Sequence, residues 1–253
     1  MIFQLHRFIL IFIRITAFIV ATPGYSYRGV PNITKVTISA GIALFVYVTV
    51  PDVVEFQGLL PYGLLVIRET ILGLALGFIS QMVFSAIEMA GKLIDFQVGF
   101  SIGAVYDPTM GASASNYGRT YYWIGIAIFF LLDMHRILME AILRSFTYVP
   151  IGTAEIGNMD TGAMLTIFAR VFEIGINLAA PMIITILMTD AVLGIISRTV
   201  PQINVFMLGM PMKSMVSFLV FILSLSWIFQ RTGTIISTIP DYIDGFLRLL
   251  GSG

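Results

Sequence analysis

The chain alternates long apolar stretches with short polar ones along almost its entire length. Six segments consist mainly of apolar residues, at 2–21, 38–54, 59–87, 120–143, 163–195 and 205–230. A helix needs about 20 mostly apolar residues to cross the hydrocarbon core of a bilayer. The pattern therefore predicts an all-α, polytopic membrane-type protein with about six apolar helical segments in a single domain over residues 1–253.

Composition supports this class and excludes several functions. Hydrophobic residues make up 58% of the chain and charged residues only 11%, against about 25% charged residues in soluble domains. Cysteine is absent, which excludes disulfides and thiolate metal sites. The net charge is zero and no basic run occurs, which argues against nucleic acid as a partner. We find no motif for a metal, a nucleotide or a catalytic nucleophile, and we predict no enzyme, no metal site and no cofactor.

The first apolar segment superficially resembles a signal peptide. Arg14 interrupts its apolar core, however, and the following VATPG is a poor cleavage site. We expect residues 2–21 to be retained as a helix.

Charged residues inside the apolar segments fall on single helix faces. The spacing of Asp133, Arg136, Glu140 and Arg144 places all four on one face of a helix over 120–144, with alternating signs that allow neighbours to pair. Such charges are costly in lipid unless they are paired or turned inward.

Two other helices carry similar stripes. Arg170 and Glu173 share a helix face over residues 163–180. Glu88 and Asp95 lie on a stripe over residues 70–95 that also carries the GxxxG of Gly73 and Gly77. These charges either brace a bundle through buried ion pairs or line a water-filled path. Both interpretations require protein neighbours on most sides, so we infer a larger assembly. We expect polar pore or inter-subunit contacts at Glu88, Asp95, Arg119, Asp133, Arg136, Glu140, Arg144, Arg170 and Glu173.

Two regions interrupt the helical pattern. Residues 105–119, VYDPTMGASASNYGR, are small and polar, and residues 197–215 carry prolines that remove backbone donors and obstruct a helix. Irregular backbone at membrane depth is tolerated only where it is buried in protein or lines a cavity. For 197–215 we expect a tight or re-entrant turn, with its helix-breaking positions at Pro201, Gln202, Asn204, Phe206, Gly209 and Pro211.

Five sequence segments, in order, resemble the FliR family of the flagellar and virulence-associated type III export gate. They are PGYSYRGVPNITKVTISAGIAL, IRETILGLALGF, AGKLIDFQVGFSIGAVYDPTMG, HRILMEAILRSFTYVPIG and TDAVLGIISRTVPQINVFMLGMPMK. The stretch IDFQVGFSIGAVYDP looks closer to the flagellar branch. Asp133 departs from the family pattern, in which an uncharged residue is expected ahead of the histidine.

The resemblance implies long bent helical hairpins and a place in a helical pore built with FliP-like and FliQ-like subunits. It further implies contact with FlhB-like and FlhA-like gate proteins and membrane lipid, passage of unfolded flagellar proteins, and a location in the bacterial inner membrane at the flagellar basal body. In such proteins a loop at this position helps to plug the closed pore, which here gives Val105, Tyr106, Asp107, Pro108, Thr109, Met110, Gly111, Ala112, Ser113, Ala114, Ser115, Asn116, Tyr117 and Gly118.

One alternative function stays open on the residues alone. A secondary transporter could place ion or proton sites at its broken helices, using Glu88, Asp95, Asp107, Arg136 or Asp190. It would require an inverted repeat, and none is evident. An ordinary surface connection is likewise the alternative to a plug at 105–118.

Overall fold

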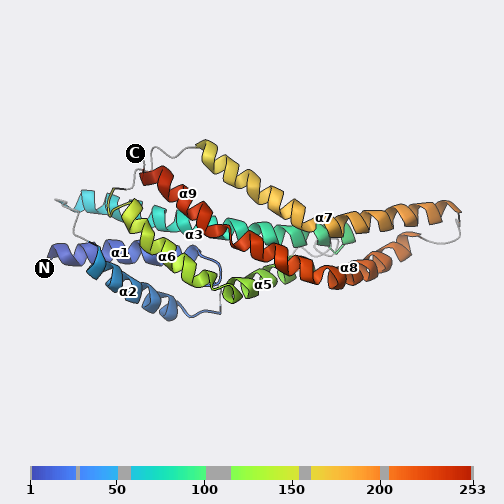
Figure 1. Cartoon of the computed structure of the whole chain (residues 1–253), viewed down its shortest axis with the longest axis horizontal. Helices are drawn as coiled ribbons and strands as arrows, with labels where there is room; N and C mark the ends of the chain where they lie inside the picture. The colour runs from blue at the N-terminus through green and yellow to red at the C-terminus, as the bar shows by residue number, and fades with distance from the viewer. Residues whose placement is uncertain are drawn as a thin grey trace. The chain divides into compact units, whose positions relative to one another are not determined.

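The described part of the chain is built of α-helices connected by short segments. A computed structural model describes residues 2–26, 29–50, 58–100, 115–153, 161–199 and 205–251, and no strand occurs in these ranges. The helices (Figure 1) are α1 (Ile2–Ala21), α2 (Asn32–Thr49), α3 (Leu59–Val98), α5 (Asn116–Leu131), α6 (Met134–Tyr148), α7 (Thr161–Thr199), α8 (Val205–Ile236) and α9 (Ile239–Gly251).

The prediction of an all-α polytopic membrane protein is confirmed. Within the described ranges, five stretches are long and apolar enough to cross a membrane: Gln4–Ala21, Asn32–Thr49, Leu60–Val98, Phe168–Thr199 and Leu208–Leu250. They differ in how far they lie inside the protein. The α3 stretch is 56% buried, whereas the α7 stretch is 17% buried. The apolar surface of α3 is therefore largely covered by the chain itself, and that of α7 is left for other molecules.

The third predicted segment is much longer than its apolar pattern. Its apolar run ends at residue 87 and its predicted charge stripe reaches Asp95, and α3 continues to Val98. Its polar extension is stabilised locally: Lys92 Nζ lies 2.6 Å from Glu88 Oε1 one turn earlier, an arrangement that favours a helix. Asp95 lies in the last turn of α3 and is buried, with 1% exposure.

The fourth predicted segment is two helices rather than one. α5 ends at Leu131 and α6 begins at Met134, with Asp133 between them in the left-handed region at φ 52°. This corrects the expected common face, because Asp133 lies outside the helix that carries Arg136. A residue with positive φ ends the regular helical path, and Asp is one of the few side chains that adopts this conformation readily.

The expected turn at 197–215 is shorter than predicted. α7 reaches Thr199, and α8 begins at Val205 and contains both Gly209 and Pro211. Pro211 therefore lies inside a helix, where it removes one backbone donor, as Pro181 does in α7. Pro201, Gln202 and Asn204 lie outside the described residues. The last helix, α9, was not expected from the pattern.

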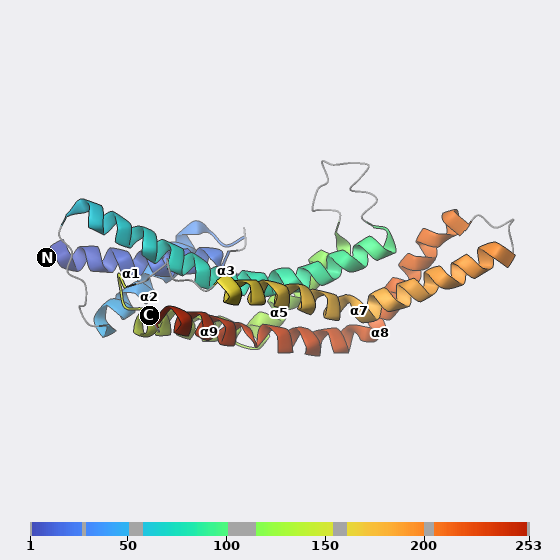
Figure 2. The same cartoon turned by 90° about the horizontal axis from the view of Figure 1, so that it is seen from above.

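The chain divides into two compact units. The first comprises Met1–Val83, Phe129–Ile167 and Ser237–Gly253, and the second comprises Phe84–Ile128 and Phe168–Ile236. In the second unit α7 and α8 form a helical hairpin (Figure 2), joined by an ion pair between Lys213 and Asp190.

In the first unit α1 packs against α3 at the predicted GxxxG. A Cβ added to Gly77 would lie 2.8 Å from the carbonyl oxygen of Phe18, and one added to Gly73 would collide with the carbonyl oxygen of Arg14. Only glycine allows two helix backbones to approach so closely. The predicted close contact is confirmed, and its partner is α1.

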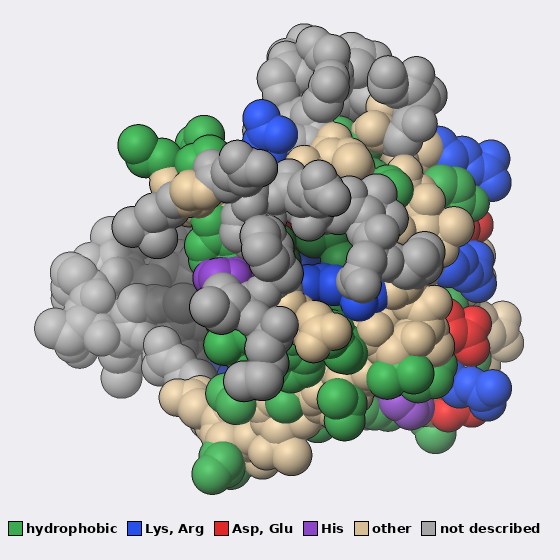
Figure 3. Space-filling view, turned by 90° about the vertical axis from the view of Figure 1, so that its left-hand side faces the viewer, with side chains coloured by type: hydrophobic (Ala, Val, Ile, Leu, Met, Phe, Trp, Pro, Cys, Tyr) green, Lys and Arg blue, Asp and Glu red, His purple; other side chains and the backbone are tan. Residues whose placement is uncertain are grey.

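The other expected pairs along α6 are also present. Glu140 lies 3.6 Å from Arg136 and 3.7 Å from Arg144, and Arg144 also lies 3.5 Å from Asp244 of α9. Acidic and basic side chains alternate along the right-hand edge of the face shown in Figure 3. The side chains of Arg136, Glu140 and Arg144 are exposed, to 79% for Arg136, whereas that of Asp244 is 24% exposed.

Candidate functional site

The carboxylate of Asp95 binds the start of α5 in the second unit. It accepts hydrogen bonds from Ser115 Oγ at 2.6 Å and from the backbone N–H groups of Tyr117 and Gly118, each at 3.1 Å. The first N–H groups of a helix have no partner within the helix. Asp95 of α3 therefore caps α5, with a negative charge at the positive end of its dipole.

The backbone of Asp95 caps its own helix as well. Its carbonyl oxygen accepts hydrogen bonds from Gly99 N–H at 3.1 Å and Phe100 N–H at 3.0 Å. Gly99 has φ 100°, a conformation that glycine adopts without steric cost and that commonly ends helices. One buried residue thus bonds to the chain on both sides of the segment 101–114.

Tyr117 connects this cap to α8. Gly91 of α3 lies directly against the Tyr117 carbonyl group, so that a side chain there would collide with backbone. The Tyr117 hydroxyl donates to Ser217 Oγ at 3.0 Å, and its ring meets that of Phe221 edge-on at 5.5 Å. Burial raises the pKa of Tyr117 above its usual value of 10.0, which keeps the hydroxyl protonated as a donor.

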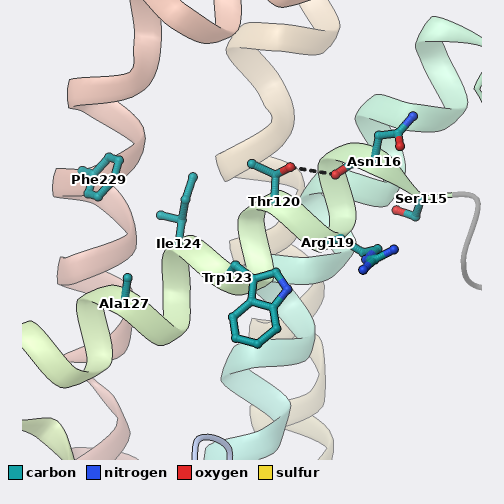
Figure 4. A pocket seen from close by; sticks show the side chains of 8 residues that line it. All are labelled: Ser115, Asn116, Arg119, Thr120, Trp123, Ile124, Ala127 and Phe229. Atoms are coloured by element: carbon teal, nitrogen blue, oxygen red, sulfur yellow. Dashed lines mark hydrogen bonds between the residues drawn. The ribbon is translucent and has the colours of Figure 1, made fainter. Parts of the chain in front are cut away.

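A groove of about 540 Å³ runs along the outer side of α5 and reaches Phe229 of α8 (Figure 4). Its polar end carries Ser115, Asn116, Arg119 and Thr120, and its apolar remainder carries Trp123, Ile124, Ala127 and Phe229. Arg119 is exposed, and the described ranges give it no acidic partner. The groove therefore combines an available positive charge with an apolar floor.

Asp190 belongs to a polar cluster between three helices of the same unit. It lies 2.6 Å from Lys213 of α8 and accepts a hydrogen bond from Gln97 of α3 at 3.3 Å. Its charge is therefore balanced by a lysine, which favours a bracing role for Asp190 over the ion site considered for a transporter.

The first unit contains a buried ion pair that the sequence did not reveal. Arg14 Nε lies 2.5 Å from Glu69 Oε2, and both side chains have 0% exposure. Arg14 also donates to the carbonyl oxygens of Ser145 and Val149 at 3.2 and 2.9 Å. The only available signal was a charge inside an apolar helix, which requires a partner but does not identify it.

Around this pair, further contacts hold the end of α6. The Arg14 guanidinium lies 4.2 Å from the ring centre of Phe146, and Glu69 Oε1 accepts a hydrogen bond from Gly152 N–H at 2.8 Å. The pair therefore joins α1, α3 and the turn after α6. It is a structural centre of the first unit, shielded from water.

The structure brings together only some of the predicted site residues. Ser115, Tyr117 and Gly118 meet Asp95, whose carboxylate bonds within the chain. The pore or inter-subunit contact expected at Asp95 stays a prediction. The contacts expected at Glu88, Arg119, Arg136, Glu140, Arg144, Arg170 and Glu173 remain predictions, and within the chain Arg170 pairs with Glu173 at 2.5 Å.

Part of the predicted plug and turn cannot be placed. Residues 105–114 lie outside the described residues, and so does the side chain of Phe206. For the described ranges, no group of three or more histidine, cysteine or acidic side chains is arranged to hold a metal ion.

Comparison with known proteins gives one consistent result. The family model described as "Bacterial export proteins, family 1" matches residues 5–239. The flagellar biosynthetic protein FliR of Bacillus subtilis is 34% identical over 247 residues, covering 96% of this chain and 95% of that protein.

More distant relatives also belong to flagellar or secretion systems. FliR of Aquifex aeolicus is 28% identical over 221 residues, covering 86% of this chain and 84% of that protein. The secretion system apparatus protein SsaT of Salmonella typhimurium is 29% identical over 161 residues, covering 63% of this chain and 62% of that protein. The resemblance to FliR is thereby confirmed, and the chain belongs to the bacterial export proteins of family 1.

Proposed function

We propose that this protein is a non-enzymatic subunit of the flagellar type III export gate, in the inner membrane at the flagellar basal body. The observation that carries the proposal is the similarity to Bacillus subtilis FliR over 96% of this chain. In this role it forms, with FliP-like and FliQ-like subunits, the pore through which unfolded flagellar proteins pass. FlhB-like and FlhA-like proteins are its further partners.

The uncovered apolar surface of α7 and α8 supports a role within an assembly. Met188 and Ile195 of α7 are 63% and 66% exposed, and Leu219 and Leu223 of α8 are 61% and 76% exposed. Exposed apolar area on this scale marks contact with lipid or with other proteins. We assign it to neighbouring subunits of the gate and to membrane lipid.

We further propose that residues 105–118 act as the plug of the closed pore. Small residues dominate this stretch, which lowers the side-chain entropy lost when it changes place. The described end of the segment supports the proposal, because Ser115, Tyr117 and Gly118 are firmly held by Asp95. Because this end is held by α3, the preceding residues can rearrange in our proposal without displacing α5.

The polar contacts of the assembly are assigned to the exposed charges. Arg119 stands at the polar end of the α5 groove. Its charge has no acidic partner among the described residues and suits an acidic side chain of a neighbouring subunit. The paired charges Glu88, Arg136, Glu140, Arg144, Arg170 and Glu173 either extend such contacts or brace the chain.

Co-purification tests the assignment to the gate. An affinity-tagged copy, expressed from its own locus, should leave the membrane in detergent together with the FliP-like and FliQ-like proteins. Deleting the gene should abolish export of flagellar proteins while the membrane potential stays normal. A chain that purified alone, and that transported a small solute in liposomes, would refute the assignment.

A short internal deletion tests the plug. Removing residues 105–112 leaves Ser115 and the cap of α5 in place, so the helices keep their contacts. The membrane should become leaky to ions and small solutes, whereas a substitution of these residues by an equally long Gly-Ser segment should leak less. Unchanged permeability of the deletion variant, at normal protein level, counts against the plug.

A further inference from the structure

The connection between α3 and α5 is held at both ends by one buried side chain and its backbone. Asp95 accepts two hydrogen bonds through its carbonyl oxygen, from Gly99 and Phe100. It accepts three through its carboxylate, from Ser115, Tyr117 and Gly118. Asp95 is only 1% exposed, so these hydrogen bonds are protected from competition by water.

Two further contacts around Asp95 bring the two ends of the connection together. Gly91, one turn before Asp95, leaves room for the Tyr117 backbone. Phe100 stacks on Tyr117 with ring centres 6.3 Å apart and an interplanar angle of 20°. The residue just before the segment 101–114 therefore contacts one just after it directly, in addition to their common bonds to Asp95.

The same cluster extends to α8. Ser217 is fully buried and accepts from the Tyr117 hydroxyl while donating to the carbonyl oxygen of Ser214 at 2.8 Å. Phe218 lies 5.9 Å from Tyr117 and 6.3 Å from Phe100 between ring centres. Both ends of the connection thus rest on α8 as well as on α3.

We propose that Asp95 is the positioning residue of the plug, because it holds the residues that flank segment 101–114, Phe100 and Ser115, together on α3 and α8. The proposal rests on the plug assigned above. It assigns Asp95 no contact with exported protein. Its effect on the pore acts only through Ser115, Tyr117 and Gly118.

An isosteric substitution isolates the carboxylate. In Asp95→Asn, an amide NH₂ at the Oδ2 position would face the Gly118 N–H, a backbone donor that cannot be reversed. The Ser115 bond must then also change direction. The amide can also turn by 180°, and its NH₂ then faces the Tyr117 N–H instead. Either orientation loses one hydrogen bond to a charged acceptor, which corresponds to about a 10- to 100-fold shift between anchored and released ends.

The readout is permeability of the closed gate, measured together with assembly. Asp95→Asn should raise the leak of small solutes several-fold while the FliP-like and FliQ-like proteins still co-purify and export continues. Ser115→Ala removes one of the bonds and should give a smaller leak in the same direction. A residue that was merely structural would lower protein level and export together, without a leak from the assembled gate.

Covalent rescue gives an independent test, because the chain contains no cysteine. Cysteines placed at Phe100 and Ser115 in the Asp95→Asn background can be joined by a short bis-maleimide. The cross-link should restore sealing, whereas modification of each cysteine separately should not.

The outcomes separate this proposal from the plug itself. If the 105–112 deletion leaks but Asp95→Asn and Ser115→Ala seal normally, the positioning role is wrong and the plug stands. If neither the deletion nor Asp95→Asn leaks, the plug is wrong and the positioning role falls with it. If Asp95→Asn leaks and the cross-link does not restore sealing, the anchoring of the ends is overturned.

Discussion

Replacing Arg14 by methionine should severely destabilise the first unit. Methionine fills a similar elongated volume but removes the positive charge, which leaves the Glu69 carboxylate buried with 0% exposure and without its partner at 2.5 Å. Removing one member of a buried ion pair costs about 3–5 kcal/mol. The hydrogen bonds to Ser145 and Val149 are lost at the same time.

This free energy corresponds to a large shift in thermal stability. For chains of this size, 1 kcal/mol corresponds to about 2–4 °C, so the midpoint of unfolding should fall by roughly 6–20 °C. The assay is size-exclusion chromatography of detergent-solubilised protein after heating to a series of temperatures. The readout is the fraction that stays monodisperse.

The double variant Arg14→Met with Glu69→Met provides the control. Replacing both charges by apolar side chains removes the uncompensated charge, and such replacements in other proteins are often neutral. We therefore expect the double variant to be more stable than either single variant, with a residual loss of about 1–3 kcal/mol for the unpaired Gly152 N–H and α6 carbonyl groups. A double variant that lost the sum of the two single losses would refute a direct pairing of Arg14 with Glu69.

Three further predictions concern other contacts. Gly73→Ala should destabilise the protein by about 1–3 kcal/mol through overpacking against α1. The control Gly63→Ala, at a site with nothing within 4 Å, should be neutral or stabilising by up to about 1 kcal/mol. Equal melting midpoints for the two variants would contradict the close approach of α1 to Gly73. Glu140→Ala removes two exposed ion pairs and should change stability by less than about 1 kcal/mol, so a clear fall in its melting midpoint would show that these pairs are shielded in the isolated protein. Asp190→Lys should lower the amount of membrane-inserted protein in a quantitative immunoblot, and adding Lys213→Asp should recover part of it, because the two groups lie 2.6 Å apart; no recovery would argue against their pairing.

The apolar pattern predicts helices well where a helix is uniformly apolar or ends at a turn. α1 has the predicted bounds, because TPGY after Ala21 contains residues that end a helix. The pattern fails where polar residues continue a helix. α3 passes its apolar limit at residue 87 because Glu88 pairs with Lys92 and Asp95 finds hydrogen-bond donors 20 or more residues away.

The break between α5 and α6 shows a different limit. The apolar run continues through Leu131 and Leu132, and the spacing of charges after it fits one helix. The left-handed conformation of Asp133 ends that helix, and no periodicity reports the φ angle of a single residue. Here the chain changes direction at an aspartate that the charge pattern had assigned to a helix face.

The sequence identified residues of the candidate site but not their contacts. The family resemblance drew attention to residues 105–118, and the charge stripe drew attention to Asp95. What the sequence could not supply was their contact, since Asp95 and Ser115 are paired by the fold and not by helical spacing. The partner of Arg14 was hidden in the same way, because Glu69 belongs to another helix.

The double capping by Asp95 also bears on how this protein can be engineered. Because Phe100 and Ser115 are both bonded to one buried residue, the helices do not depend on the length of chain that joins them. Doubling the length of a flexible connection costs only about 0.6 kcal/mol in closure entropy. We therefore expect the helical scaffold to tolerate an epitope inserted between Phe100 and Ser115, and the effect of a graded series of such inserts on permeability would test the proposed plug.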